Sequence, residues 1–559
     1  MKRVHFLFSV LVSVLLLSTS VNLSAQKRLI VKPSYTGTAV DTFATIKLAV
    51  AAAGTVSGVA DTVIVYDGTY KEKISFSRYS SPGNRSLVLA SRFILDGDTN
   101  HIKNTVISGG GIVQSSQNDI LVSAYGDNRN TEWFQFVGFT IDSASKYGLY
   151  LEGGQVANCI LKNSGATAYI PYLFQGTRII NSKIYNNIGP AIFAFSQIGS
   201  DANSPMWKVE NSFFYNNKAL SSNSERDDRG GPWNQQYIGA VIWSTNSTKG
   251  RLSNNIFYKN NGDNIISSGG DRTTDTLDVF NNVFYKNNTK TAYFMNWWGQ
   301  FGQNNYTSRW YNNIIDNNYT SATNNTNSEF AWGDGGSNGK PNEYYFKNNL
   351  IATEFNTNKG QTSNFSTTFT FNYDTATQII GVAQFKDAVN GDFSLLPTSP
   401  GIGAGNVNFS TTKDYLGNNR PNPVRSGIDM GAVESILAMP TPAITSLQNA
   451  VIGGKKAIKI NFSIYNNPKV DSVIIYRSTA SKDTVTILSS SGTYSKTNRK
   501  DTLLNNTSVF TDTSSLVNAT KYYYTIKSFI KSGLLTSEAS KLDRITTRTA
   551  TSKVSIPTS

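Results

Sequence analysis

The stretch Asn254-Asn-Ile-Phe-Tyr-Lys-Asn260 recurs almost unchanged as Asn281-Asn-Val-Phe-Tyr-Lys-Asn287. More divergent copies begin at five further asparagines, which are Asn158, Asn181, Asn211, Asn312 and Asn348. Successive copies start 23, 30, 43, 27, 31 and 36 residues apart. A constant motif at uneven spacing indicates one structural unit that carries loops of different length.

Each copy predicts short apolar strands separated by asparagine turns, with a third strand such as Gly148-Leu-Tyr-Leu151 completing the unit. Asparagine tolerates the left-handed backbone of tight turns, and stacked units would bring equivalent asparagines within hydrogen-bonding distance. The sequence therefore predicts an all-β fold, a right-handed parallel β-helix with three strands per coil. An antiparallel sandwich is the alternative, but it does not need the same asparagine in every unit.

The residues before the repeats predict a capping helix and a secretion signal. Residues 41–53 predict a short helix that covers the open first coil, with Asp41 or Thr42 as its N-cap. Residues 1–25 have the basic start, apolar run and small-residue end of a secretory signal peptide. The apolar run is shorter than the roughly 20 residues of a membrane span. The mature chain is therefore expected to be secreted, extracellular or else periplasmic or on the cell surface, monomeric, and not membrane-spanning.

The composition excludes several kinds of active site. The chain has 1 Cys and 2 His, which rules out a disulfide framework and multi-cysteine metal sites. Because His5 lies in the signal segment, His101 alone would have to serve any histidine-based triad or zinc site. Cys159 is expected to be a small buried residue. Any catalysis should therefore depend on carboxylates, Lys, Arg and Tyr.

Three motifs resemble pectin-lyase-like β-helix proteins. The helix followed by Asp61-Thr-Val-Ile-Val-Tyr-Asp-Gly-Thr-Tyr70 resembles their entry, and the Asn254–Asn260 type of unit resembles their coils. The segment Asp392–Glu434 resembles the one that closes β-helices in many secreted bacterial proteins of the choice-of-anchor type. The resemblance implies a β-helix domain over residues 26–439. It implies little about activity, because this fold carries lyases, hydrolases, esterases and adhesins.

A second module is expected after the proline-rich joint at residues 439–442. Its alternating strands resemble a fibronectin type III domain over residues 440–549, followed by a polar tail at 550–559. From Thr441 onward the chain has 16 Lys and Arg against 6 Asp and Glu, which is most of the formal charge of +14. We expect this module to bind an anionic glycan or cell surface, and we expect no nucleic acid partner for an exported protein.

In the resembling lyases, the substrate lies in a groove along the strand that follows the variable turn. Transferred to this chain, the groove strands carry aromatic and acidic side chains that suit sugar rings and hydroxyls. The alternative is that these aromatics pack under neighbouring loops. The candidate substrate-binding residues are Tyr150, Glu152, Trp243, Trp297, Trp298 and Trp332.

Two reaction types fit the charged residues beside this groove. β-Elimination on a uronic acid needs a cation and a base, for which Arg272, Arg229 and Lys290 are candidates, and calcium is the candidate cofactor. Hydrolysis needs two carboxylates, for which Asp271 and Asp334 would lie about 10 Å apart along the stack. The candidate calcium ligands are Asp228, Asp263 and Asp271.

The sequence thus predicts a carbohydrate-active protein whose partner is a polysaccharide or a cell-surface glycan. The leading hypothesis is a polysaccharide lyase that cleaves an acidic, uronic-acid glycan. One alternative is a non-catalytic extracellular protein for glycan binding or adhesion. The other is a glycoside hydrolase with paired aspartates.

Overall fold

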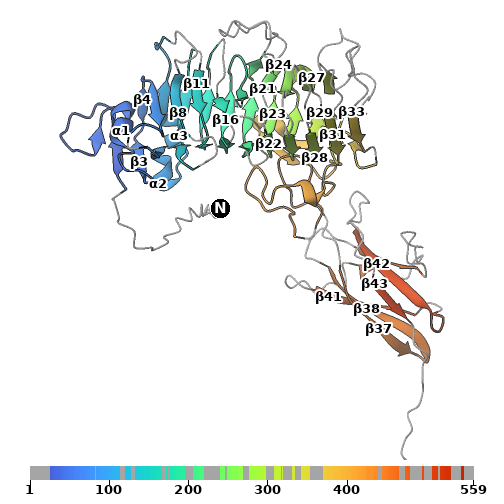
Figure 1. The fold of residues 1–559 in the computed structure, drawn as a ribbon. Helices are drawn as coiled ribbons and strands as arrows, with labels where there is room; N and C mark the ends of the chain where they lie inside the picture. The colour runs from blue at the N-terminus through green and yellow to red at the C-terminus, as the bar shows by residue number, and fades with distance from the viewer. Residues whose placement is uncertain are drawn as a thin grey trace, which may run out of the picture.

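Three parallel β-sheets run the length of a solenoid (Figure 1), which confirms the predicted right-handed parallel β-helix. Successive coils add strands to the same three sheets, and the strand pairing within them is parallel throughout. The computed structural model describes residues 26–81, 83–113, 120–126, 132–145, 147–165, 171–173, 176–195, 205–219, 240–245, 249–268, 276–296, 307–316, 318, 330–333, 342–352, 369–374, 376–424, 426–438, 443–464, 472–478, 494–495, 506–513, 516–529 and 543–546.

The sheets are named here by their strand numbers. The 13-stranded sheet contains β1 (Arg28–Val31), β2 (Thr42–Phe43), β3 (Ala60–Val65), β6 (Ser86–Ser91), β9 (Phe134–Val137), β12 (Gln155–Ala157), β15 (Arg178–Ile180), β18 (Trp207–Glu210), β22 (Lys249–Ser253), β25 (Thr276–Phe280), β28 (Thr307–Tyr311), β31 (Asn342–Lys347) and β33 (Phe369–Tyr373). The 11-stranded sheet contains β4 (Gly68–Tyr70), β7 (Thr105–Ser108), β10 (Thr140–Asp142), β13 (Ile160–Lys162), β16 (Lys183–Tyr185), β19 (Phe213–Tyr215), β23 (Ile256–Tyr258), β26 (Val283–Tyr285), β29 (Ile314–Asp316), β32 (Leu350–Ile351) and β34 (Ile379–Ile380). The 10-stranded sheet contains β5 (Ile74–Ser77), β8 (Ile120–Tyr125), β11 (Tyr147–Leu151), β14 (Pro171–Leu173), β17 (Ile192–Phe195), β20 (Lys218–Ala219), β21 (Ala240–Thr245), β24 (Asn261–Ser268), β27 (Asn288–Asn296) and β30 (Phe330–Gly333).

The capping helix starts later than the sequence suggested. Thr42 and Phe43 form β2, which pairs with β1, so neither Asp41 nor Thr42 can cap a helix there. The helix α1 (Ile46–Ala52) is instead capped by Thr45, whose side chain accepts a hydrogen bond from Leu48 N. Two further short helices, α2 (Phe93–Asp96) and α3 (Asn100–Asn104), follow β6. Within the described part of the chain, no helix is long and apolar enough to cross a bilayer.

The first asparagine of each repeat makes the turn from the 13-stranded sheet to the 11-stranded sheet. All seven of these residues have φ between 50° and 59°, in the left-handed region, at Asn158, Asn181, Asn211, Asn254, Asn281, Asn312 and Asn348. This conformation raises the energy of an L-residue because its Cβ clashes with the backbone, and asparagine tolerates it better than most residues do. The predicted role in the turn is confirmed.

Asn181 offers a simple test of this role because its side chain is exposed. Replacing Asn181 with alanine should lower the free energy of unfolding by about 1 kcal/mol, because alanine is strained at positive φ. Asn181→Gly should cost less than half as much, since glycine has no Cβ. Urea unfolding of the three proteins measures the difference. Equal costs for Ala and Gly would contradict the backbone explanation.

The second residue of each repeat forms a hydrogen-bonded ladder inside the corner. Asn255 Nδ2 donates to Asn282 Oδ1 at 3.0 Å, Asn282 Nδ2 to Asn313 Oδ1 at 3.1 Å, and Asn313 Nδ2 to Asn349 Oδ1 at 2.9 Å. A second ladder runs through the turn into the 10-stranded sheet. It contains Asn187, Asn217, Asn260, Asn287 and Asn318. The predicted stacking of equivalent asparagines is therefore confirmed, and most of it uses different asparagines from the left-handed ones. Among the left-handed ones, Asn254 Nδ2 donates to Asn211 Oδ1 at 3.1 Å.

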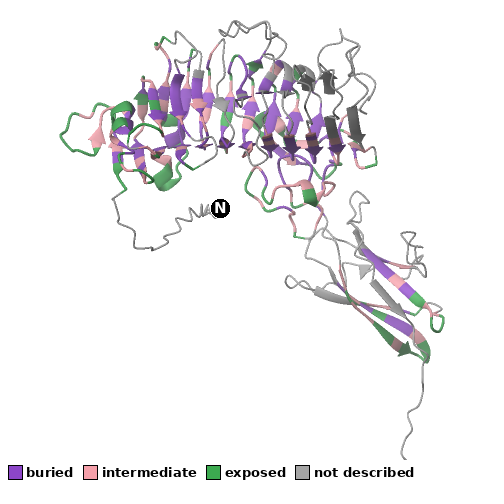
Figure 2. Cartoon of the chain, in the orientation of Figure 1, coloured by how far each residue is buried: buried purple, intermediate pink, exposed green. Residues whose placement is uncertain are grey.

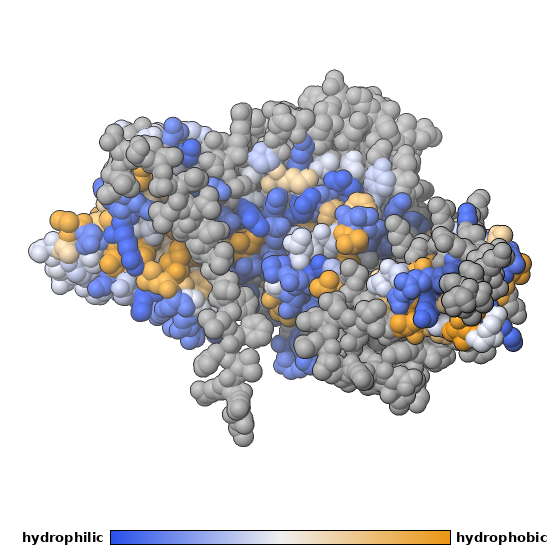
Figure 3. All heavy atoms as spheres, turned by 90° about the horizontal axis from the view of Figure 1, so that it is seen from below, coloured by the Kyte–Doolittle hydropathy of each residue, from blue (hydrophilic) through white to orange (hydrophobic). Residues whose placement is uncertain are grey.

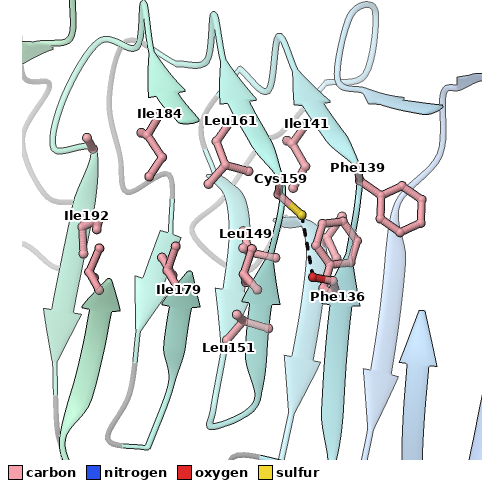
Figure 4. Close-up of a cluster of buried hydrophobic side chains, with 14 of the residues drawn as sticks. Phe136, Phe139, Ile141, Leu149, Leu151, Cys159, Leu161, Ile179, Ile184 and Ile192 are labelled. Atoms are coloured by element: carbon pink, nitrogen blue, oxygen red, sulfur yellow. Dashed lines mark hydrogen bonds between the residues drawn. The ribbon is translucent and has the colours of Figure 1, made fainter. Parts of the chain in front are cut away.

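The interior is a continuous apolar core that follows the solenoid axis (Figure 2). Phe214, Phe257 and Phe284 stack in consecutive coils with ring centroids 4.8 Å apart. Cys159 lies in the same core (Figure 4), and its thiol donates to the backbone oxygen of Ala157 at 3.3 Å. Burial raises the pKa of this thiol to about 12. The expectation of a small buried cysteine is confirmed.

A closing segment, residues 376–438, returns along the outside of the solenoid. It contains the hairpin β35 (Phe385–Asp387) and β36 (Asp392–Leu395) and the short helices η2 (Ala388–Asn390) and η3 (Val407–Phe409). Its apolar residues pack on the outer face of the 11-stranded sheet around Phe213, Tyr258 and Tyr285. Phe409 stacks on Tyr311 of the 13-stranded sheet with centroids 3.9 Å apart. The closing segment therefore covers parts of two of the three sheets.

The last described strands form a small sandwich of two antiparallel sheets. One contains β37 (Ala443–Ile452), β38 (Lys455–Ile464) and β41 (Asn506–Asp512), and the other contains β39 (Ser472–Ser478), β40 (Tyr494–Ser495), β42 (Lys521–Phe529) and β43 (Asp543–Thr546). A shared core of Ile458, Phe462, Ile475 and Tyr524 joins them. The resemblance of this sandwich to a fibronectin type III domain stays a prediction.

Candidate functional site

The 10-stranded sheet supplies the strands predicted to form the groove. The closing segment packs on the outer faces of the other two sheets, through the contacts described above. Inward-facing residues of the 10-stranded sheet, such as Leu149, Leu151 and Ile192, are fully buried in the core. The alternate residues of these strands therefore belong to the outer face.

Four aromatic residues occupy one register row across this sheet. Tyr150 in β11 pairs with Tyr172 in β14, Tyr172 pairs with Phe193 in β17, and Phe193 pairs with Trp243 in β21. Neighbouring strands are about 4.8 Å apart, so the row extends over four consecutive coils. Tyr150 and Trp243, which the sequence proposed for substrate binding, thus lie in the same row.

At the N-terminal end of this row, Tyr150 is held in place by its neighbours. Its ring packs against Tyr125 with centroids 5.0 Å apart, and its hydroxyl donates to Glu152 Oε1 at 2.6 Å. Gly126 N donates to the other carboxylate oxygen, Glu152 Oε2, at 3.0 Å. Both side chains are half-buried. The result is a fixed aromatic surface beside a carboxylate.

This arrangement suits binding better than proton transfer. Both oxygens of Glu152 already accept hydrogen bonds, so the carboxylate orients the phenol of Tyr150 and the turn at Gly126. A tyrosine pair with restricted rotamers offers a flat apolar face at little entropic cost, which is what the C–H face of a sugar ring requires. Glu152 can bind a hydroxyl only by sharing an oxygen that already has a donor.

Most of the proposed catalytic groups lie outside the described residues, namely Arg272, Asp271, Arg229, Asp228 and Asp334, as do Trp297 and Trp298. Chain connectivity still relates them to the sheet. Residues 269–275 leave the C-terminal end of β24, residues 297–306 that of β27, and residues 334–341 that of β30. Because these three strands are parallel neighbours, their C-terminal ends share one edge of the 10-stranded sheet. Residues 220–239 enter β21 from the opposite edge.

Two proposed groups occupy neighbouring strands at the same level. Asp263 in β24 and Lys290 in β27 both lie between the register pairs Gly262–Thr289 and Asn264–Thr291. Trp243 and Trp332, both proposed for substrate binding, do not share a row. The row of Trp243 continues through Phe294 to Ala331, and Trp332, the next residue after Ala331, pairs with Met295. Trp243 and Trp332 therefore lie in adjacent rows of the sheet. The side chains of Asp263, Lys290, Trp243 and Trp332 are outside what the structure describes.

Of the two histidines, His101 lies within the described residues, and it is engaged elsewhere. His101 Nδ1 lies 2.6 Å from Asp67 Oδ1, and Nε2 lies 3.2 Å from Asp96 Oδ2. It belongs to α3, which contacts β7 and β10 of the 11-stranded sheet. With both ring nitrogens occupied, His101 acts as a link between α2, α3 and the turn after β3. In the described ranges, no group of three or more His, Cys, Asp or Glu could hold a metal ion.

The sequence analysis missed two aromatic residues, Tyr125 at the end of β8 and Tyr172 in the register row of Tyr150. The residues of β8 before Tyr125 are all buried, including Leu121 and Ser123, so this strand shows no alternation of buried and exposed positions. Tyr172 lies in a strand of only three residues. Neither strand therefore offered a periodic signal that could have identified its tyrosine.

Comparison with known proteins adds little beyond the fold. No protein-family model matches the chain, and no curated protein matches it. Two solved structures resemble parts of it. YbhC from Escherichia coli has 14% identity and a TM-score of 0.29, over 49% of this chain and 74% of that one. A pectin methylesterase from carrot has 13% identity and a TM-score of 0.31, over 62% of this chain and 89% of that one.

Proposed function

We propose that this protein is a secreted polysaccharide lyase that binds an acidic glycan along the outer face of its 10-stranded sheet. The observation that carries the proposal is the row Tyr150, Tyr172, Phe193 and Trp243 on four consecutive coils. An extended row of aromatics matches an extended ligand with repeated apolar faces, which is a polysaccharide chain.

The chemistry assigned to this face is β-elimination. Arg272 or Arg229 neutralises the uronate carboxylate, and a base, which is the other arginine or Lys290, removes the proton at C5. The electron pair left at C5 forms the C4–C5 double bond as the C4–O glycosidic bond breaks, and the leaving oxygen takes up a proton from water. Arg272 follows the C-terminal end of β24, whereas the segment with Arg229 precedes the N-terminal end of the neighbouring β21. This connectivity to the 10-stranded sheet supports the proposal.

Calcium is the proposed cofactor, and oxygen ligands suit that ion. Asp228 precedes the N-terminal end of β21 and Asp263 lies near the start of β24, so these two are the proposed ligand pair, whereas Asp271 follows the opposite end of β24.

A non-catalytic glycan-binding protein is the second candidate. It is favoured by the state of Glu152, whose two oxygens both serve to hold the local structure rather than stand free for proton transfer. Under this alternative the aromatic row binds a glycan that leaves intact. A hydrolase with Asp271 and Asp334 is the third, and it would release new reducing ends without an unsaturated product.

One experiment separates the three. The purified protein is incubated with a panel of uronic-acid polysaccharides and neutral glycans, with and without a calcium chelator. Ultraviolet absorbance reports unsaturated products, a reducing-end assay reports any cleavage, and gel retention reports binding. The proposal predicts ultraviolet-absorbing products from an acidic glycan, and fewer of them with chelator. Reducing ends without absorbance would indicate the hydrolase, and retention without cleavage the binding protein.

A further inference from the structure

A row of cationic side chains crosses the outer face of the 13-stranded sheet. Arg178 in β15 pairs in register with Lys208 in β18, and Lys208 with Arg251 in β22. The row continues through Asp278 in β25 to Arg309 in β28. The intervening residues of these strands, including Val209 and Val279, are buried in the core, so the row belongs to the outer face.

The acidic residues of this face fix the row without neutralising it. Arg178 Nε donates to Glu210 Oε2 at 2.6 Å. The buried Asp278 is shared, because Arg251 Nη2 donates to its Oδ2 at 3.0 Å and Arg309 Nε to its Oδ1 at 2.7 Å. Four cations against two carboxylates leave two positive charges in the row. Within the described residues Lys208 forms no ion pair.

The pairing also leaves hydrogen-bond donors for a ligand. A guanidinium carries five N–H groups, and each of the three arginines uses a single nitrogen in its ion pair. The exposed fractions of the side chains of Arg178, Arg251 and Arg309 are 43%, 35% and 37%. They are therefore ordered by their partners and still accessible from outside.

Two elements cover other parts of this face. Phe93 of α2 packs over Ala90, Val137 and Ala157, on strands that precede the row, and Phe409 of the closing segment packs over Phe280 and Tyr311, which lie two residues beyond Asp278 and Arg309 in β25 and β28. Seen from below (Figure 3), hydrophilic residues make up most of the described surface in the middle of the solenoid. The cationic row thus begins beyond α2 and runs beside the closing segment at β25 and β28.

We propose that this row, Arg178, Lys208, Arg251 and Arg309, is a second binding site, for a linear polyuronate lying along the solenoid axis. The cations of β15, β18 and β22 recur about every 4.8 Å, and Arg309 follows two strands after Arg251, beyond Asp278. The site therefore fits a chain of repeated carboxylates better than one small anion. Arginine donates to carboxylates with matching geometry. The site stands on the 13-stranded sheet and does not depend on the aromatic row of the 10-stranded sheet.

Single-stranded nucleic acid is the competing polyanion, and the surroundings of the row disfavour it. Proteins that bind such strands combine cations with exposed aromatics on which bases stack. Here the aromatics of the adjacent row, Phe280 and Tyr311, are buried under the closing segment, with 8% and 4% of their surface exposed. The half-buried Tyr345, which follows Arg309 in the register, is a single ring at one end of the row. A carboxylated glycan needs only the charges and donors that the row provides.

The test is equilibrium binding of polygalacturonate to the full chain at low and at physiological ionic strength. Lys208→Glu places a carboxylate between Arg178 and Arg251 and should weaken binding about tenfold at low salt. Lys183→Glu is the matched control, because Lys183 is an exposed lysine on the 11-stranded sheet and the change in net charge is the same. It should change affinity less than twofold. Carbodiimide coupling of the bound polymer should modify Lys208 and spare Lys183.

Several outcomes would overturn the proposal. Equal losses for Lys208→Glu and Lys183→Glu would show that only net charge matters. If Lys208→Glu binds the polymer as tightly as wild type does, and Lys208 of the wild type is not coupled to it, the polymer binds elsewhere. Oligo-dT that binds as tightly as polygalacturonate, with the same loss in Lys208→Glu, would assign the row to nucleic acid. Loss of lyase activity without loss of polymer binding would concern the proposed reaction and leave this site standing.

Discussion

Replacing Asn260 with alanine is expected to lower the free energy of unfolding by about 3–4 kcal/mol. Asn260 is fully buried, and its Nδ2 donates to Phe214 O at 3.0 Å and to Asn287 Oδ1 at 2.9 Å. Its Oδ1 accepts from the backbone and side-chain nitrogens of Asn217 at 3.2 and 2.9 Å. Alanine removes all four hydrogen bonds and leaves their buried partner donors and acceptors unsatisfied. Each lost bond costs roughly 1 kcal/mol or more.

Hydrogen exchange can locate this loss. The amide of Asn217 should lose protection in Asn260→Ala because its acceptor is gone, while the amide at position 260 should keep its bond to Asn287 Oδ1. Asn288→Ala is the control, since Asn288 is an exposed asparagine at the start of β27. It should cost under about 0.5 kcal/mol. Equal effects of the two changes would show that the ladder contributes little to stability.

Replacing Arg420 with methionine is expected to cost about 3–5 kcal/mol and to release the closing segment. The buried Arg420 Nη1 donates to Glu434 Oε2 at 2.7 Å, and Nη2 donates to Gly431 O at 2.8 Å and to Asn254 Oδ1 at 3.3 Å. Burial, together with the Asp429 carboxylate, raises the pKa of Glu434 to about 8. Among the described residues, Arg420 is the cation that lies beside the buried carboxylates of Glu434 and Asp429, and the variant removes it.

Limited proteolysis of residues 376–438 measures this release. Arg420→Met should be cleaved there under conditions in which wild type resists. Lys386→Met is the matched control, because Lys386 pairs with Asp392 in the same segment but is 67% exposed, and such pairs contribute under about 1 kcal/mol. If both variants resist cleavage as wild type does, Arg420 does not hold the closing segment.

The fold could be predicted because the repeat encodes its own turns. A left-handed turn strongly favours asparagine, so the first asparagine of each unit marks the corner at any spacing. The different roles of the first and second asparagine in each unit could not be predicted. The first asparagine also holds the closing segment, as Asn254 and Asn312 do through their Nδ2 atoms, while the second builds the ladder. In earlier coils, Ser182 and Ser212 occupy the ladder positions. Serine can make the same hydrogen bonds as asparagine there, but it does not match asparagine in the sequence pattern.

The candidate site could be predicted only in part, because a face depends on strand register. Tyr150 and Trp243 share a row, but Trp332 lies in the next one, and a shift of one residue in a strand reverses the face of every side chain. The cationic row on the 13-stranded sheet depends on residues 27 to 43 positions apart in the chain. Only the stacking of the coils brings them together.

Binding of an acidic glycan along the aromatic row of the 10-stranded sheet can be tested with two matched tyrosines, by measuring the affinity for a short oligouronate by calorimetry. Tyr150 packs on Tyr125 with centroids 5.0 Å apart, and Tyr185 on the 11-stranded sheet packs on Tyr215 at 4.5 Å. We expect Tyr150→Ala to weaken binding about tenfold and Tyr185→Ala to leave it unchanged. Unchanged affinity in Tyr150→Ala, or an equal loss in Tyr185→Ala, would show that the glycan does not bind along this row.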